Sequence, residues 1–326
     1  MAIGEAIIDF IPTTPGKGLA DTPAFEKRPG GAPANVAVGI ARLGGSSGFI
    51  GKFGEDEFGR FLLRTLEENH VDTRAVVLTR EAKTGLAFVT LKDNGEREFI
   101  FYRQPCADIL LTPEEIAIQY IEQAKVLHFG TVSLIVEPGR SATYHAVQWA
   151  RSAGKIISLD VNLREALWPS LAAARQEIYT ALSLAHIVKV SEEELAFITG
   201  NNESIEEETN QILALGPGLV FVTLGAGGCY VKTKHFATAV EGIAVQAVDT
   251  TGAGDAFTAA VLTRLVEIGL HDPRQIHDIS LSTMQEICTF ANIAGALTCT
   301  KNGAIPALPT KADVEERMGQ VRMNAK

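Results

Sequence analysis

The chain has 326 residues, of which 46% are hydrophobic and 21% charged, and its formal net charge is −10. The length suggests one large domain plus a smaller unit, and the composition is typical of a globular protein with a core of ordinary size. The negative charge argues against nucleic acid or an anionic membrane as the main partner, because both attract basic surfaces.

Three further features of the composition bear on compartment. The four cysteines show neither a CxxC pair nor a zinc spacing, which fits reduced thiols in a reducing compartment. The apolar runs are too short to cross a bilayer. The N-terminal MAIGEAIIDF lacks the basic region and long apolar stretch of a signal peptide. We therefore expect a cytoplasmic protein.

The chain opens on a strand-like run, GEAIIDF, followed by a proline- and glycine-rich segment over 10–30. Gly30 and Gly31 then lead into a small-residue helical pattern, ANVAVGIARL, over 34–43. Glycines at such a joint let the backbone approach another group closely, and small residues let the helix pack close to a sheet. An ordinary turn and a helix cap at Asn35 would explain the same residues individually.

Residues 83–104 break the pattern that the rest of the chain follows. Two β runs, GLAFVTL and REFIFYR, flank a DNGE turn over 93–96, which is a strong hairpin signal. No helical segment accompanies these runs. We infer a small β-sheet that projects from the main domain as a lid; an ordinary edge hairpin is the alternative.

The middle of the chain alternates apolar β-branched runs with helical patterns. Such runs are typical of strands buried on both faces, and the alternation predicts an α/β fold with a mostly parallel sheet covered by helices. The strand-like runs lie at 125–134, 155–162, 186–191 and 219–225, and the helical patterns at 141–154, 174–185, 192–200 and 203–216.

Near the C-terminus, a glycine-rich joint connects a strand-like run (242–248) to a helical run (256–270). Unpaired N–H groups at a helix N-terminus bind anions, and Gly252 and Gly254 allow close approach. Asp255 falls in the first turn, where a carboxylate also suits simple capping. An acid beside a phosphate cradle is repulsive unless it has a role, and accepting a hydroxyl proton during phosphoryl transfer is such a role.

Two segments together make the pattern specific. GGAPANVAVGIARLGG (30–45) and DTTGAGDAFTAAVL (249–262) resemble the two signatures of the ribokinase-like (PfkB) carbohydrate kinases, and no GxxxxGK[ST] loop is present. GEAIIDFIPT and NGEREFIFYRQPCADILL are similar to the plant-type fructokinases within that family. Further family marks follow in order between and after the signatures: GKFGEDEFG, DVNLREALW, KVSEEE, TLGAGG and ANIAGALTCTKNGAIPALPT.

The resemblance implies a ribokinase-like three-layer α/β/α fold with a mostly parallel central sheet and a small β-sheet lid. The main domain would comprise 1–9, 31–82 and 105–326, and the lid 10–30 and 83–104. It also implies an ATP-dependent kinase that converts D-fructose to fructose 6-phosphate. Asp255 would be the general base, and the backbone of Gly252, Ala253 and Gly254 the anion hole.

The sugar site implied by the family lies at five separated positions. A carboxylate at Asp9 can accept two hydroxyl hydrogens, and Asn35 offers a donor and an acceptor. Arg103 matches an arginine that reaches over the substrate in fructokinases, although a solvated edge charge would also explain it. The full set is Asp9, Gly30, Gly31, Asn35 and Arg103.

The nucleotide site implied by the family is equally dispersed. Ser191 stands where many relatives have asparagine within an N-x-x-E pattern; the shorter side chain has no amide donor, which weakens the expectation of a direct phosphate contact. Arg164 closes a D-x-N-x-R run and could neutralise phosphate, with a structural ion pair as the alternative. Glu194 would act on Mg²⁺ through water. The expected ATP-binding set is Lys189, Ser191, Thr223, Gly225, Gly228, Asn292 and Arg164.

Relatives also suggest a monovalent cation such as K⁺, for which Asp249, Thr251 and Gly303 are the matching ligands, and a homodimer formed through the lid. Fine sugar specificity stays open, with ribose and 2-keto-3-deoxygluconate as alternative acceptors. A non-catalytic regulatory member of the family is a further alternative, although the complete GAGD loop favours catalysis. A dinucleotide-binding oxidoreductase is disfavoured because its glycine fingerprint does not follow the first strand.

Overall fold

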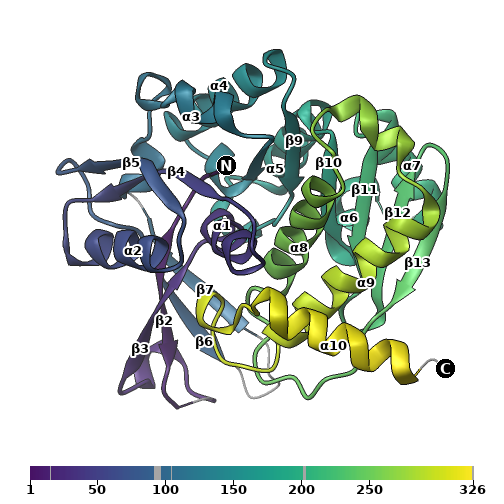
Figure 1. Cartoon of the computed structure of the whole chain (residues 1–326). Coiled ribbons are helices and arrows are strands. Elements are labelled where there is room, and N and C mark those ends of the chain that lie inside the picture. The colour runs from purple at the N-terminus through teal and green to yellow at the C-terminus, as the bar shows by residue number, and fades with distance from the viewer. Residues whose placement is uncertain (15, 92–96, 104, 201–202, 325–326) are drawn as a thin grey trace.

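The structure, a computed structural model, describes every residue except 15, 92–96, 104, 201–202 and 325–326. Within that part, the chain forms a nine-stranded sheet, in the order β13-β12-β11-β10-β9-β8-β1-β4-β5, and a separate four-stranded sheet, in the order β3-β2-β6-β7. The large sheet is parallel except near one edge, where β12 pairs antiparallel with both β11 and β13. Figure 1 shows helices on both sides of the large sheet and the small sheet projecting from one end.

The large sheet contains the strands β1 (Ala2–Ile3), β4 (Gly48–Gly54), β5 (Asp72–Thr79), β8 (Val126–Gly130), β9 (Ile156–Asp160), β10 (Ile187–Ser191), β11 (Leu219–Thr223), β12 (Gly228–Thr233) and β13 (Ala237–Glu241). The small sheet contains β2 (Ile7–Pro12), β3 (Phe25–Gly30), β6 (Leu86–Leu91) and β7 (Arg97–Tyr102). The α-helices are α1 (Ala32–Arg42), α2 (Glu57–Glu68), α3 (Ile118–Gln123), α4 (Gly139–Ser152), α5 (Leu171–Leu184), α6 (Glu192–Thr199), α7 (Ile205–Ala214), α8 (Ala253–Glu267), α9 (Leu281–Thr298) and α10 (Lys311–Asn324).

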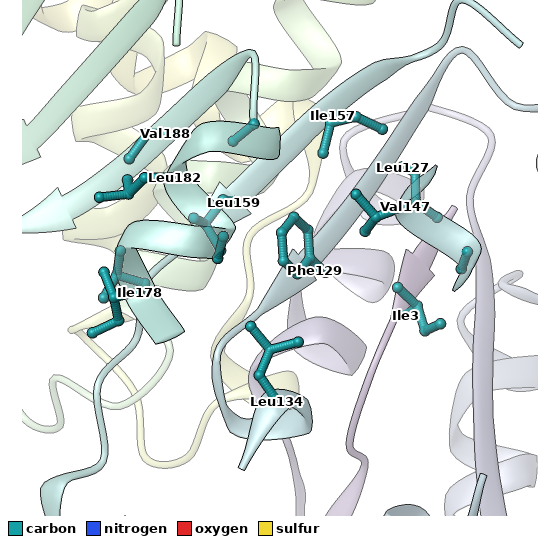
Figure 2. Close-up of a cluster of buried hydrophobic side chains, with 14 of the residues drawn as sticks. Ile3, Leu127, Phe129, Leu134, Val147, Ile157, Leu159, Ile178, Leu182 and Val188 are labelled. Carbon is teal, nitrogen blue, oxygen red and sulfur yellow. The ribbon is translucent and has the colours of Figure 1, made fainter. Parts of the chain in front are cut away.

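Two apolar layers hold these elements together. On one face of the sheet, α4 to α7 contribute side chains to one buried cluster with the strands, and Figure 2 shows Val147 of α4 and Ile178 of α5 in this cluster with Phe129 and Leu159. On the other face, α1, α8 and α9 cover alternate residues of the same strands, such as Phe221, whose ring contacts Phe257 edge to face. Since both faces are covered, the strands are apolar on both sides, which is why they appear as near-continuous hydrophobic runs in the sequence.

The predicted α/β/α fold is confirmed. The four apolar runs of the middle chain contain β8, β9, β10 and β11, and the four helical patterns correspond to α4, α5, α6 and α7.

The prediction of a strand over 242–248 is wrong. This segment has no strand assignment; it follows β13, which pairs with β12 as the edge strand of the sheet. Without a neighbouring strand the β-branched residues have nothing to pair with, and Val248 is 57% exposed. The segment is instead fixed at its end, where the Val248 N–H donates to the carbonyl oxygen of Cys299 at 2.8 Å. A loop, rather than a strand, therefore precedes α8.

The small sheet has two different faces, because side chains alternate along a strand. Asp9, Ala87 and Phe101 lie in one row across β2, β6 and β7, and Phe10, Phe88 and Ile100 lie in the next. The second row lies on the opposite face of the small sheet: Phe10 stacks on Phe88 and meets Phe58 of α2 edge to face, while Ile100 is exposed. The first row contains residues that line the cavity described below, as expected of a lid.

The structure does not test several of the sequence-based predictions about the lid. The DNGE turn at 93–96 lies outside the described residues. The division of the chain into a main domain and a lid stays a prediction; strand β2 begins at Ile7, inside the segment assigned to the main domain. Pairing of two copies through the lid also stays a prediction.

None of the helices in the described part has the length and apolar character that a bilayer span requires.

Candidate active site

The glycine-rich joint forms the N-terminus of α8. Gly252 is the cap residue, with φ of +83°, a conformation that glycine adopts without steric cost. A Cβ at this position would lie 2.9 Å from the Cβ of Ala304, so the close packing also requires glycine. The backbone N–H groups in the first turn of this 15-residue helix point out of its N-terminal end, where the positive end of the helix dipole lies. The N–H of Ala253 also donates to the carbonyl oxygen of Thr250 at 3.3 Å, and the anion hole stays a prediction.

Asp255 does not cap its own helix. Its carboxylate is 8% exposed and accepts a 2.7 Å hydrogen bond from the amide Nδ2 of Asn35 on α1, a residue 220 positions away. The Oδ1 of Asn35 is buried and has no hydrogen-bond partner in the described part of the chain. Both residues line a cavity of about 650 Å³. Asn35 is thus not a helix cap, because Gly31 caps α1, and its side chain lines the cavity.

The surroundings of Asp255 suit a general base. Burial raises its pKa to about 6, and the nearby charge of Asp160 acts in the same direction. The hydrogen bond from Asn35 and the positive charges of Lys189 and Arg164 lower the pKa and partly offset that rise. A base with a pKa just below neutrality is largely ionised at pH 7 yet still has a useful proton affinity.

The Asn35 contact leads to a prediction about pH dependence. Asn35→Leu removes the hydrogen bond to the ionised carboxylate, so the pKa of Asp255 should rise. A base works only when unprotonated, and the acid limb of kcat/KM should therefore move to higher pH, by about one unit, since hydrogen bonds to charged groups contribute roughly 1.5–3 kcal/mol. The measurement is sugar kcat/KM between pH 5 and 9. An acid limb that stays in place would show that Asn35 does not tune the base.

A second group of charges lies beneath the loop. The ammonium Nζ of Lys189 on β10 lies so close to Gly254 that an added Cβ there would be 3.0 Å from it. Lys189 is 9% exposed and lines the cavity. Burial lowers its pKa, but the charges of Asp160 and Glu194 outweigh burial, so the pKa is raised overall and the side chain stays an ammonium.

Ser191 and Glu194 form a capping box at the start of α6. The Ser191 hydroxyl accepts from the Glu194 N–H at 3.1 Å, and one oxygen of Glu194 accepts from the Ser191 N–H at 2.8 Å. Its other oxygen accepts from the N–H of Leu163 at 2.7 Å. Burial, the largest influence, raises the pKa of Glu194. Both oxygens are held by backbone groups, which suits contact with a hydrated metal better than direct ligation.

One end of the cavity contains residues of both the main sheet and the lid. Asp9, Gly31 and Arg103 line it, whereas Gly30 does not. A Cβ at Gly30 would collide with the carboxylate of Asp9, so this glycine makes room for Asp9 rather than meeting a ligand itself. Arg103 is 6% exposed and forms an ion pair with Asp108, which excludes the alternative of a solvated edge charge.

Glu5 is a cavity residue that the sequence reasoning missed. It lies two residues after the end of β1, is 5% exposed, and its Oε2 has no hydrogen-bond partner among the described residues. Burial raises its pKa to about 7, against the opposing charge of Arg103. The available signal was its place at the carboxyl end of a parallel strand, where ligands meet such sheets.

The remaining predicted nucleotide residues do not line this cavity; Thr223, Gly225 and Gly228 lie where β11 ends and β12 begins, and Asn292 lies on α9. Thr223 is the register partner of Ser191. Gly228 has φ of +97° and leaves no room for a Cβ beside the carbonyl of Val240. Asn292 donates from Nδ2 to the carbonyl oxygens of Val240 and Glu241, both at 3.0 Å. Gly225 begins a short 3₁₀ turn, Gly225–Gly227, between β11 and β12.

The residues predicted to hold a monovalent cation lie behind the loop. One oxygen of Asp249 accepts from the N–H of Thr251 at 2.7 Å, and the other accepts from the N–H of Gly303 at 2.9 Å. The hydroxyl oxygen of Thr251 is buried without a hydrogen-bond partner in the part of the chain that the structure describes. Ala253, the third residue of the predicted anion hole, is the first residue of α8.

Comparison with known proteins identifies the family of the chain. A family model described as pfkB family carbohydrate kinase matches residues 1–311. The chain is 49% identical over 318 residues to fructokinase-1 of Oryza sativa subsp. japonica, with 98% of this chain and 97% of the relative covered.

Two solved structures extend the comparison. A fructokinase from Xylella fastidiosa with bound ATP has a TM-score of 0.89 and 34% identity, covering 98% of each chain. A fructokinase from Vibrio cholerae O395 with fructose, ADP and a calcium ion bound has a TM-score of 0.85 and 38% identity, covering 96% of each chain. The chain therefore belongs to the pfkB family of carbohydrate kinases.

Proposed function

We propose that this protein is an ATP-dependent fructokinase that converts D-fructose to fructose 6-phosphate, with Asp255 as the general base. The observation that carries the proposal is the position of a buried, hydrogen-bonded carboxylate of raised pKa beside the N-terminus of α8. Relatives whose names state fructokinase activity cover nearly the whole chain, and one of their structures contains fructose and ADP.

In this proposal the 6-hydroxyl proton passes to the Asp255 carboxylate as the hydroxyl oxygen bonds to the γ-phosphorus of ATP, and the bond from that phosphorus to the leaving ADP oxygen breaks. The backbone N–H groups of Gly252, Ala253 and Gly254 stabilise charge on the transferring group. Lys189, against Gly254, adds a positive charge. Such a reaction depends on alignment and charge stabilisation rather than on a covalent intermediate.

The acceptor site is proposed to hold the sugar through Asp9, Gly31, Asn35 and Arg103, with Gly30 securing the position of Asp9. The partnerless Oδ1 of Asn35 and Oε2 of Glu5 offer acceptors for sugar hydroxyls, since buried polar atoms without partners are unfavourable until a ligand supplies a donor.

The nucleotide is proposed to lie along the edge of the sheet that runs from the loop past Ser191. Arg164 lines the cavity and would face the phosphates, which favours a ligand role over a purely structural one. The proposed nucleotide residues are Lys189, Arg164, Ser191, Thr223, Gly225, Gly228 and Asn292.

Two cations belong to the proposal. Mg²⁺ bound to the nucleotide needs few protein carboxylates because it retains several waters. Glu194 fits this role through water, since both its oxygens are already held by backbone N–H groups. For K⁺, the partnerless hydroxyl oxygen of Thr251 beside the carboxylate of Asp249 suits a monovalent ion, with Gly303 completing the set.

The acceptor assignment is tested by ADP release with a panel of sugars at fixed MgATP. Fructose should give the highest kcat/KM, exceeding ribose and 2-keto-3-deoxygluconate by at least about 10-fold. A sugar that lacks a matching hydroxyl leaves a buried polar group of the site unpaired, which costs more than about 1 kcal/mol for each such group. If ribose or 2-keto-3-deoxygluconate were turned over faster than fructose, the substrate assignment would be wrong while kinase activity would stand.

A further inference from the structure

Asp160 is a buried carboxylate that the proposed reaction leaves unused. It ends β9, is 1% exposed and is not among the residues that line the cavity. One of its oxygens, Oδ1, lies 3.1 Å from the Lys189 ammonium. The other, Oδ2, accepts a hydrogen bond from the Thr258 hydroxyl at 3.2 Å. Because Asp160 does not line the cavity, it would act on a reaction there through its neighbours.

The fold explains why these three side chains meet. Asp160 and Lys189 are direct partners in the parallel register of β9 and β10, so their side chains emerge on the same face of the sheet. Thr258 follows Asp255 by three residues on α8 and therefore lies on the same helix face. A single carboxylate thus connects two strands to the helical turn that carries the proposed base.

The Lys189 ammonium needs this partner. A lysine has a flexible four-carbon stem, so its charge is placed only by what holds it. Lys189 is nearly fully buried, and an ammonium in that environment without a partner would be strongly unfavourable. Held by Asp160, the ammonium lies against Gly254, where the developing charge of phosphoryl transfer would fall.

We propose that Asp160 is a positioning residue for phosphoryl transfer: it holds the Lys189 ammonium beneath the Gly252–Gly254 loop and connects it to α8 through Thr258. This inference rests on the proposed kinase function and adds a residue that does not contact substrate.

The same carboxylate also influences the base through its charge. Asp160 raises the pKa of Asp255, second only to burial, whereas Lys189 lowers it. Removing the Asp160 charge should therefore lower the pKa of Asp255 and move the acid limb of kcat/KM to lower pH. This direction is opposite to the one expected for loss of Asn35, so a general disturbance of the site would not reproduce both.

The test is Asp160→Asn, which keeps the shape and removes the charge. We expect kcat to fall about 10- to 100-fold, since small misplacements of catalytic groups have effects of that size. The acid limb of kcat/KM should move down by about half to one pH unit, a modest share of the shift that a nearby charge can produce. A folded variant with the wild-type acid limb and near wild-type kcat would overturn the proposal.

A double variant with both Asp160→Asn and Lys189→Gln distinguishes a positioning role of Asp160 from a purely structural one. If Asp160 acts through Lys189, kcat of the double variant should lie within about threefold of Lys189→Gln alone, because coupled residues are not additive. A double variant whose loss of kcat equals the product of the two single-variant losses would contradict the proposal. The double variant also removes the unpaired ammonium, so it should fold even if Asp160→Asn alone does not, and its acid limb should still lie below that of Lys189→Gln.

A matched control is Asp56→Asn. Asp56 caps α2 by accepting from the Gly59 N–H and also accepts from the Thr84 N–H, so the same chemical change costs stability away from the base. Its acid limb should match that of the wild type. All variants are assayed with whichever sugar the wild type uses best. A wild type that prefers another sugar would thus refute the fructose assignment alone, and one inactive on every sugar would refute both proposals.

Discussion

Replacing Asp255 with asparagine is expected to lower kcat by about 100- to 10,000-fold, the usual contribution of a general base. The amide has nearly the same shape and can still accept the hydrogen bond from Asn35, which the carboxylate now accepts at 2.7 Å. It cannot take up a proton at neutral pH. The fold and the binding of both substrates should therefore survive while turnover is lost.

Stability should not fall in this variant. An acid whose folded-state pKa is raised stabilises the native state below its unfolded pKa, and that contribution is lost as pH rises through the folded value, here about 6. At pH 8 the ionised Asp255 is therefore a cost to folding, and the amide should melt at the same temperature or higher.

The measurements are single-turnover rates, fructose and ATP affinities, and melting temperatures. Asp313→Asn serves as control, because Asp313 only caps α10 by accepting from the N–H of Thr310 at 2.8 Å. Near wild-type turnover by folded Asp255→Asn would remove Asp255 from the mechanism.

Gly252→Ala is expected to have the second largest effect, with kcat reduced about 100-fold by displacement of the Gly252–Gly254 loop. The residue has φ of +83°, and the new Cβ would lie 2.9 Å from the Cβ and 3.0 Å from the Cα of Ala304. Relief of that contact must move the loop, and with it the N–H groups and Asp255. The free energy of unfolding should drop by roughly 1–3 kcal/mol because of the strained backbone.

Gly269→Ala is a control that distinguishes the effect of backbone strain from the effect of moving the loop. Gly269 has a similar φ of +90°, but no atom lies within 4 Å of the Cβ position, and it follows the far end of α8. It should lose about 1 kcal/mol of stability through the backbone conformation alone and keep its kcat. Equal kcat in the two variants would show that the position of the loop does not limit turnover.

The parts of the fold that could be predicted are those set by local patterning. Strands β8 to β11 are buried on both faces, and their short apolar runs identify them without knowledge of their neighbours. The run at 242–248 has the same composition, yet it follows the edge strand β13 and has nothing to pair with. Composition reports the tendency to form a strand, whereas the presence of a partner depends on the whole topology.

The site was predictable where motifs carry a backbone requirement and less so where it depends on isolated side chains. The positive φ of Gly252 and the crowding at Gly30 are properties that only glycine satisfies, so a glycine motif marks them. Glu5 and Asp160 are single acids at strand ends, and nothing local distinguishes a cavity wall from a buried ion pair. Register decides that Asp160 meets Lys189, and register is not visible in either segment alone.

The most direct test of the central claim is a crystal structure with fructose and a non-hydrolysable ATP analogue bound together. We expect the 6-hydroxyl oxygen within hydrogen-bond distance of the Asp255 carboxylate, about 2.6–3.2 Å, and the γ-phosphate on the N–H groups of residues 252–254. A complex in which the carboxylate faces away from every sugar hydroxyl, or in which the γ-phosphate lies elsewhere, would contradict it.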